Sequence, residues 1–183
     1  EIVEKYFRFS EQDYSFEPTL TIWPEASYPY SIHSGERELS AFKGRGLKSR
    51  FLIGSIFVGR EDGKRKSYNS AFLVGPDGGI LGRYDKIFLV PFSERVVFED
   101  YIPFIRKLVP PIAGDFGTGS EYRVFDLDNG KFSVLICFEA IYPAVSRNFV
   151  RRGAGFLVNI TNDAWFGRTS GPYQHFEIAR IRA

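Results

Sequence analysis

The sequence predicts a single α/β domain whose sheet contains both parallel and antiparallel strands. Short apolar runs typical of strands alternate with segments typical of helices, and two tight-turn signals join neighbouring strands as hairpins. The 183 residues, 44% hydrophobic and 25% charged, are enough for one domain with a substantial core. No repeat or low-complexity linker divides the chain, so we interpret residues 1–183 as one domain.

The N-terminal half is predicted to contain two helices and four strands. Apolar residues recur with helical spacing in the first segment. Ser34 can cap a second helix that Gly44 ends, and Pro24 ends the first strand. A Gly-Pro-Asp-Gly-Gly turn makes the last two strands a hairpin. The predicted ranges are 2–9 and 34–43 for the helices, and 20–23, 51–58, 68–74 and 80–84 for the strands.

The C-terminal half is predicted to contain three strands and two helices. Asp-Asn-Gly at 128–130 is a tight-turn signature between two strands. Pro143 suits the first turn of a helix, and Gly153 suits its end. The predicted ranges are 122–127, 131–137 and 156–160 for the strands, and 143–152 and 174–183 for the helices. The aromatic segment 88–112 has no regular pattern.

Charge and composition exclude several classes of function. Lys and Arg total 24 against 22 Asp and Glu, without the basic stripe typical of nucleic-acid binding. The single cysteine excludes an internal disulfide and a multi-cysteine metal site, and His33 and His175 lie far apart in sequence. We therefore predict no metal, no cofactor and no nucleic-acid partner. The 19 Phe, 10 Tyr and 2 Trp suit either a core or an apolar pocket.

The ends of the sequence are those expected of a piece of a longer chain. Position 1 is Glu, no Met occurs anywhere, and the last ten residues read as a helix still in progress. No run of about 18 apolar residues is present, so none of the chain is expected to span a bilayer. The domain is accordingly expected to be incomplete at both termini.

Three polar residues lie at the ends of predicted strands. Cys137 ends an apolar run and precedes a sharp turn into a helix, a place where the helix dipole favours a thiolate. Glu25 follows Trp23 and Pro24, and Lys86 follows the hairpin strand. Each also has an ordinary interpretation, as a buried small hydrophobe, a loop carboxylate and a solvated lysine.

Together the three residues suit nucleophilic attack on a carbonyl carbon. A free thiol has a pKa of about 8.5, so a few per cent is ionised at neutral pH. A neighbouring carboxylate can remove the proton, and a fixed ammonium group can stabilise the resulting oxyanion. Neither histidine stands in a context that favours serine-type chemistry.

At these residues the sequence resembles the nitrilase superfamily of carbon-nitrogen hydrolases, whose signature is a Glu–Lys–Cys triad in that chain order. The segments that carry the resemblance cover most of the chain. These segments resemble one branch of the superfamily in particular, the apolipoprotein N-acyltransferases. They read IWPEA at 22–26, YDK at 84–86, LVPFSE at 89–94, ICFE at 136–139, NITNDAWFG at 159–167 and GPYQHF at 171–176.

The resemblance implies a four-layer α-β-β-α sandwich with the triad at one end of the strands. It implies Glu25 as general base, Lys86 as oxyanion stabiliser and Cys137 as nucleophile, with Glu94 and Glu139 as supporting carboxylates. An aromatic pocket could exclude water from a thioester and hold an acyl chain. Its candidate residues are Trp23, Phe88, Phe92, Phe138 and Trp165.

The implied reaction transfers a phospholipid acyl chain, through a cysteine thioester, to the N-terminal amine of a diacylglyceryl-cysteine lipoprotein. Members of this branch carry membrane helices on both sides of the domain. The resemblance thus implies a bacterial inner-membrane protein with this domain on the periplasmic or outer side. Two alternatives remain open, which are a soluble nitrilase-type amidase and a non-catalytic domain that keeps the fold.

Overall fold

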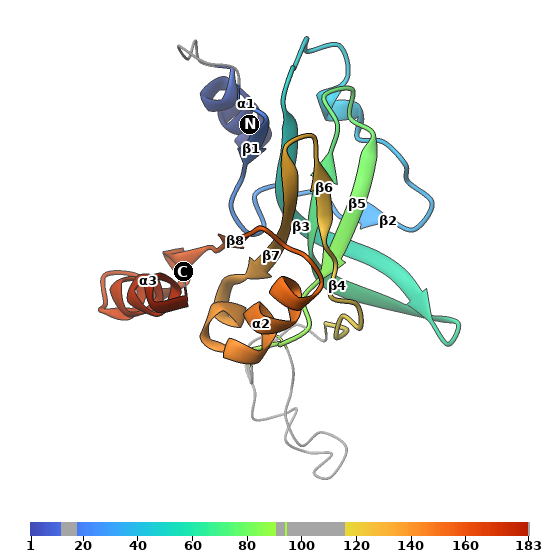
Figure 1. Cartoon of the computed structure of the whole chain (residues 1–183). Coiled ribbons are helices and arrows are strands. Elements are labelled where there is room, and N and C mark those ends of the chain that lie inside the picture. The colour runs from blue at the N-terminus through green and yellow to red at the C-terminus, as the bar shows by residue number, and fades with distance from the viewer. Residues whose placement is uncertain (12–17, 91–93, 95–115, 183) are drawn as a thin grey trace.

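Two β-sheets and the helices that cover them make up the chain (Figure 1). The computed structural model describes residues 1–11, 18–90, 94 and 116–182. The α-helices are α1 (Ile2–Ser10), α2 (Pro143–Arg151) and α3 (Gly171–Arg182), and short 3-10 helices are η1 (Ser40–Phe42), η3 (Cys137–Ile141) and η4 (Asp163–Phe166). The strands are β1 (Leu20–Ile22), β2 (Ile32–His33), β3 (Arg50–Glu61), β4 (Lys64–Val74), β5 (Ile80–Asp85), β6 (Phe125–Leu127), β7 (Gly130–Ile136) and β8 (Phe156–Ile160).

The first sheet is mixed, as the sequence predicts. Its order is β1-β3-β4-β5, and β2 pairs with β3 farther along the same strand. The pairs of β3 with β1 and β2 are parallel, whereas β3–β4 and β4–β5 are antiparallel hairpins. The predicted hairpin around residues 75–79 is therefore present. The β3–β4 hairpin turns at Asp62 and Gly63, both with positive φ, a tight turn that the sequence predictions missed.

The second sheet contains β6, β7 and β8 in that order. The pair β6–β7 is the predicted hairpin at Asp-Asn-Gly, and β7–β8 is a parallel pair. A parallel pair needs a crossover connection, which η3 and α2 supply between β7 and β8. Pro143 begins α2, and Gly153 at φ +95° follows its end, as predicted.

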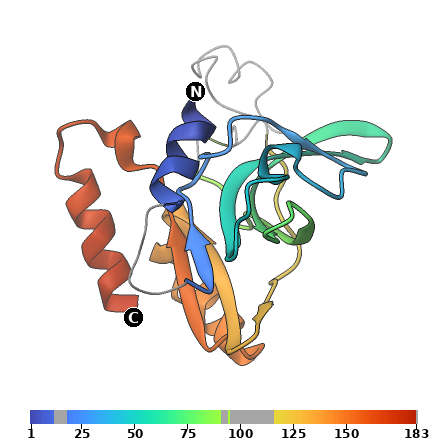
Figure 2. The same cartoon turned by 90° about the horizontal axis from the view of Figure 1, so that it is seen from above.

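Alternating side chains on β3 and β4 divide the core into two clusters. Phe51 and Phe72 join α1 residues Val3 and Phe7 on one face of the first sheet. On the other face, Leu52 and its neighbours pack against the second sheet and α2. The order is thus α1, first sheet, second sheet, α2, so the predicted α/β sandwich with mixed sheets is confirmed. In both views α3 lies on the side away from the tip of the β3–β4 hairpin (Figures 1 and 2).

One predicted helix is wrong. Residues 34–43 form turns and a bridge, and their only helical part is the 3-10 turn η1. Gly35 adopts a φ of +99°, outside helical values, and Glu38 forms an antiparallel bridge with Gly79. Leu39 N–H donates to the Gly78 carbonyl, so the β4–β5 turn binds the backbone that a helix would use internally.

The described helices are short for a membrane environment. Among residues 1–11, 18–90, 94 and 116–182, no helix has both the length and the apolar character needed to cross a bilayer.

Candidate active site

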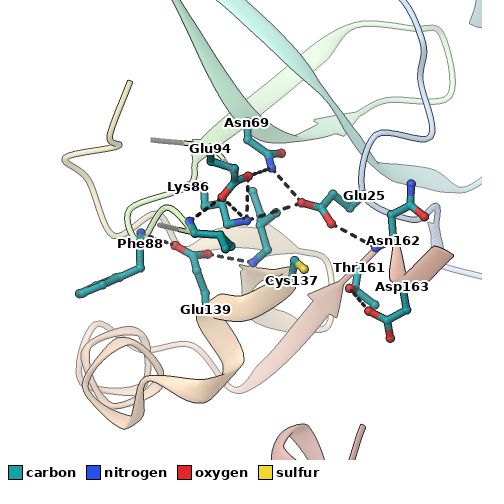
Figure 3. A network of polar contacts seen from close by, with 12 residues as sticks. Glu25, Asn69, Lys86, Phe88, Glu94, Cys137, Glu139, Thr161, Asn162 and Asp163 are labelled. Carbon is teal, nitrogen blue, oxygen red and sulfur yellow. Dashed lines mark hydrogen bonds and ion pairs between the residues drawn. The ribbon is translucent and has the colours of Figure 1, made fainter. Parts of the chain in front are cut away.

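Three strand ends bring Glu25, Lys86 and Cys137 into one group of side chains (Figure 3). Glu25 follows β1, Lys86 follows β5 and Cys137 follows β7. The first two strands lie in one sheet and β7 lies in the other, so the group sits where the two sheets end together. Lys86 Nζ lies 3.6 Å from Glu25 Oε1, and both residues act electrostatically on the Cys137 thiol.

Lys86 is a buried ammonium group held by two carboxylates. Its side chain is only 1% exposed, and Nζ lies 2.8 Å from Glu94 Oε2 and 2.9 Å from Glu94 Oε1. Burial by itself would lower the pKa of Lys86, but the charges of Glu94 and Glu25 outweigh burial, and the pKa is raised. Lys86 therefore stays a cation, which suits it to stabilise negative charge on a substrate oxygen.

Asn69 on β4 fixes the two carboxylates relative to each other. Its Nδ2 donates to Glu25 Oε1 at 2.8 Å and to Glu94 Oε1 at 2.7 Å. The second oxygen of Glu25 accepts the backbone N–H of Asn162 at 3.1 Å. Glu25 is thus oriented from both sheets, by an amide on the first and by a backbone group that follows the second.

Glu139 joins the turn after Lys86 to the turn that holds Cys137. Its side chain is fully buried, and Oε1 accepts the backbone N–H groups of Ile87 and Phe88. The Tyr84 hydroxyl also donates to Oε1, and the Ile136 N–H donates to Oε2 at 2.8 Å. Burial raises the pKa of Glu139, while these four donors act against that rise.

The Cys137 backbone has a conformation that is rare for a residue with a side chain. Its φ is +54°, in the left-handed region, at the point where β7 ends and η3 begins. Such a residue costs free energy unless the surrounding structure enforces it, and these residues cluster at functional sites. The sharp turn leaves the thiol half-buried at the end of the sheet.

The thiol of Cys137 is strongly protonated at rest. Burial is the main cause that raises its pKa to about 11, and the charge of Glu25 adds to it. Thr161, Lys86 and the backbone N–H of Phe138 act in the opposite direction. At neutral pH the sulfur is therefore a thiol, so its attack on a carbonyl requires a base to remove the proton.

The matched family agrees with this geometry. The family model described as carbon-nitrogen hydrolase matches residues 18–183, which include all three strand ends. The chain belongs to the carbon-nitrogen hydrolase family. The predicted nitrilase superfamily is thereby confirmed.

Two related proteins that match this carbon-nitrogen hydrolase chain have been named for acyl transfer. This chain is 45% identical to the apolipoprotein N-acyltransferase of Geobacter metallireducens, over 100% of this chain and 36% of that protein. It is 39% identical to apolipoprotein N-acyltransferase 2 of Treponema denticola over 91% of this chain and 34% of that protein. The chain thus spans about a third of the length of these relatives.

Solved structures show the same fold at low identity. Saccharomyces cerevisiae Nit3, a nitrilase-superfamily member, superposes with a TM-score of 0.64 at 18% identity, over 99% of this chain and 62% of that chain. The glutamine-dependent NAD+ synthetase of Acinetobacter baumannii gives a TM-score of 0.54 at 22% identity, over 88% of this chain and 28% of that chain. Both likenesses concern the fold alone.

The three predicted pocket residues whose side chains the structure describes have different neighbours. Trp23 packs in the cluster with α1, and its indole N–H donates to Ser10. It also lines a cavity of about 450 Å³ with residues 20–22 and Tyr6. Phe88 stacks on Tyr142, and Phe138 lies near His175. Phe92 and the Trp165 side chain lie outside the described residues, so the pocket stays a prediction.

Sequence reasoning missed the residues that lie within strands or act through backbone groups. Asn69 lies inside β4, and Asn162 contributes through its main chain. His175, whose sequence context favours no chemical role, is buried with both ring nitrogens hydrogen-bonded. Donor atoms of Cys137, Asp163 and His175 lie within 4.8 Å of one another, a spacing that a metal ion could use. A hydrogen bond already joins His175 to Asp163, and the absence of a metal stays a prediction.

Gly54 on β3 makes room for the backbone of Glu25. A Cβ atom at this position would lie 2.6 Å from Glu25 Cα and 2.7 Å from Ala26 N, closer than such atoms approach. We expect Gly54→Ala to displace Glu25 and to slow acylation of Cys137 about tenfold to a hundredfold, measured with a reactive ester. Gly59→Ala on the same strand is the control, because its Cβ would meet only the Phe57 ring. Equal rates for the two variants would contradict this expectation.

Alkylation of the only cysteine should show the raised pKa directly. Because the thiolate is the reactive form, the rate with iodoacetamide should rise about tenfold per pH unit from pH 7 to 10, without a plateau. Folding raises the pKa of the thiol from its ordinary value of 9.0 to about 11. The stability that the bound proton contributes to the folded state is therefore complete below pH 9 and is lost as the pH rises through about 11. A rate that levels off between pH 9 and 10 would show an ordinary thiol.

Proposed function

We propose that residues 1–183 are the catalytic domain of a larger N-acyltransferase that uses Cys137 as nucleophile, Glu25 as base and Lys86 as oxyanion stabiliser. The observation that carries the proposal is the buried Glu25–Lys86–Glu94 group beside the only cysteine. The identity to named apolipoprotein N-acyltransferases supports the choice of reaction. Glu94 and Glu139 then serve as positioning residues for Lys86 and for the Cys137 turn.

In the first step Glu25 takes the thiol proton while the sulfur attacks the ester carbonyl of a phospholipid. The carbonyl oxygen becomes an oxyanion next to Lys86, whose ammonium group stabilises it. When the intermediate collapses, the carbon–oxygen ester bond breaks, and the leaving alkoxide of the lysophospholipid takes the proton from Glu25. The products are the lysophospholipid and an acyl thioester on Cys137.

In the second step an amine attacks the thioester. Glu25 accepts the amine proton, the carbon–sulfur bond breaks, and the thiolate regains a proton from Glu25. The raised pKa of the thiol makes it a poorer leaving group, so the proton from Glu25 assists this step. The proposed acceptor is the N-terminal amine of a diacylglyceryl-cysteine lipoprotein.

The proposed substrates place the protein at a membrane. We infer a bacterial inner-membrane enzyme, anchored by segments outside this chain, with this domain on the periplasmic or outer side. The two bacterial relatives that are named apolipoprotein N-acyltransferases support this location.

The decisive experiment traces one acyl group through both steps in the protein that carries this chain. After incubation with an alkyne-tagged phospholipid, we expect the mass of one acyl chain on Cys137. Addition of a diacylglyceryl-cysteine peptide with a free N-terminus should move the tag to that peptide. Cys137→Ser should carry no thioester.

Other outcomes of this experiment identify the alternatives. Release of the tag as free fatty acid, with or without the peptide, would assign water as the acceptor and favour a hydrolase. A protein that takes up no tag on Cys137 would contradict the proposal and favour a domain that keeps only the fold.

A further inference from the structure

His175 lies directly behind the nucleophile turn, although sequence reasoning gave it no role. It comes from α3, is 5% exposed, and places Nε2 3.0 Å from the carbonyl oxygen of Cys137. A carbonyl oxygen can only accept a hydrogen bond, so Nε2 carries the hydrogen in this contact. The ring therefore binds the main chain of the same residue whose side chain is proposed to react.

Asp163 in η4 holds the other side of this ring. Its Oδ1 lies 3.0 Å from His175 Nδ1 and also accepts the hydroxyl of Thr161 at 2.8 Å. Asp163 and the Cys137 carbonyl each present an oxygen atom to one ring nitrogen. Asp163 thus fixes the orientation of the imidazole ring on one side, and the ring binds the Cys137 carbonyl on the other side.

The network begins and ends at Cys137. Thr161 acts to lower the pKa of the thiol, and its hydroxyl donates to Asp163. Asp163 holds His175, which binds the Cys137 carbonyl. Thr161, Asp163 and His175 come from the segment after β8, so they clamp the turn from a different element than Glu139 does. A left-handed φ of +54° at a residue with a side chain needs such support from its surroundings.

We propose that His175 is a positioning residue that, held by Asp163, fixes the backbone carbonyl of Cys137 and so aims the sulfur toward the acyl carbon. The proposal rests on the nucleophilic role of Cys137 in the proposed function, but it does not depend on which acyl donor or acceptor is used. Loss of the clamp frees the turn to relax, and a misplacement of about 1 Å can slow a reaction about a hundredfold.

The test measures acylation of Cys137 by p-nitrophenyl butyrate, an activated ester that replaces the natural donor. Nitrophenolate release gives the limiting rate and the half-saturating concentration, per folded molecule determined by circular dichroism. The variants are His175→Ala, His175→Phe, which fills the space with an apolar ring, and His175→Gln, whose amide can donate to the carbonyl. His33→Ala, at the other and exposed histidine, is the matched control.

We expect the Ala and Phe variants to reduce the limiting rate about a hundredfold, with the half-saturating concentration changed less than about threefold. His175→Gln should recover at least about tenfold of that loss, and His33→Ala should match the parent. A Phe variant with the parent rate, or a Gln variant as slow as Ala, would overturn the proposal, because a purely structural role predicts lower melting temperatures with unchanged rates. If the parent itself is not acylated on Cys137, the proposed function fails instead.

Discussion

Lys86→Met should reduce the rate of Cys137 acylation about a hundredfold to a thousandfold. The substitution keeps an unbranched side chain of similar length but removes the cation beside the thiol, and loss of one oxyanion donor costs this much in comparable sites. The rate is measured as adduct formation on Cys137 in folded protein. Lys43→Met is the control, because Lys43 is an exposed lysine paired with Glu38.

The same substitution should lower the free energy of unfolding by about 3–5 kcal/mol, the usual cost of removing one partner of a buried ion pair. Glu25 and Glu94 would then face each other across Asn69 without a cation between them. The pKa of Lys86 is raised in the folded state, so its stabilising contribution is fully present at neutral pH and is lost only at alkaline pH. Denaturant unfolding at pH 7 measures this loss, and a loss equal to that of Lys43→Met would contradict the prediction.

The sequence predicted the three proposed catalytic residues because each lies at or just after the end of a strand. Apolar runs mark where strands end, and a polar residue placed there is carried to the edge of a sheet. Pro24 and the turn after β7 marked two of those ends. What the runs could not reveal is which strands lie side by side, since the pairing of β1 with β3 and of β7 with β8 is long-range.

Asn69 and Gly54, which also support the site, carried no local sequence signal. Asn69 lies in the middle of β4, where its neighbours indicate only an extended strand. Gly54 matters because the Glu25 backbone comes close to it, and this approach depends on the pairing of β3 with β1. The helix predicted at residues 34–43 is absent for the same kind of reason, because contacts with the distant β4–β5 turn outweighed a local capping signal.

Glu139→Gln should destabilise the fold more than a Glu→Gln substitution at an exposed site does. The carboxylate accepts four hydrogen bonds, from Tyr84 and from the backbone of Ile87, Phe88 and Ile136. An amide has one acceptor and one donor end, so its NH₂ group must face at least one buried N–H. Each buried donor left without an acceptor costs about 1–3 kcal/mol. We expect the free energy of unfolding to fall by about 3 kcal/mol, measured by denaturant unfolding.

Tyr84→Phe separates the role of one donor from that of the carboxylate. It removes the hydroxyl donor to Glu139 and leaves the three backbone donors in place, so the expected loss is about 1 kcal/mol, close to one hydrogen bond. Because Glu139 joins the backbone after Lys86 to the backbone before Cys137, its Gln variant should also slow acylation more than Tyr84→Phe does. Equal effects of the two substitutions on stability and rate would show that the carboxylate's contacts with Ile87, Phe88 and Ile136 do not hold the two turns together.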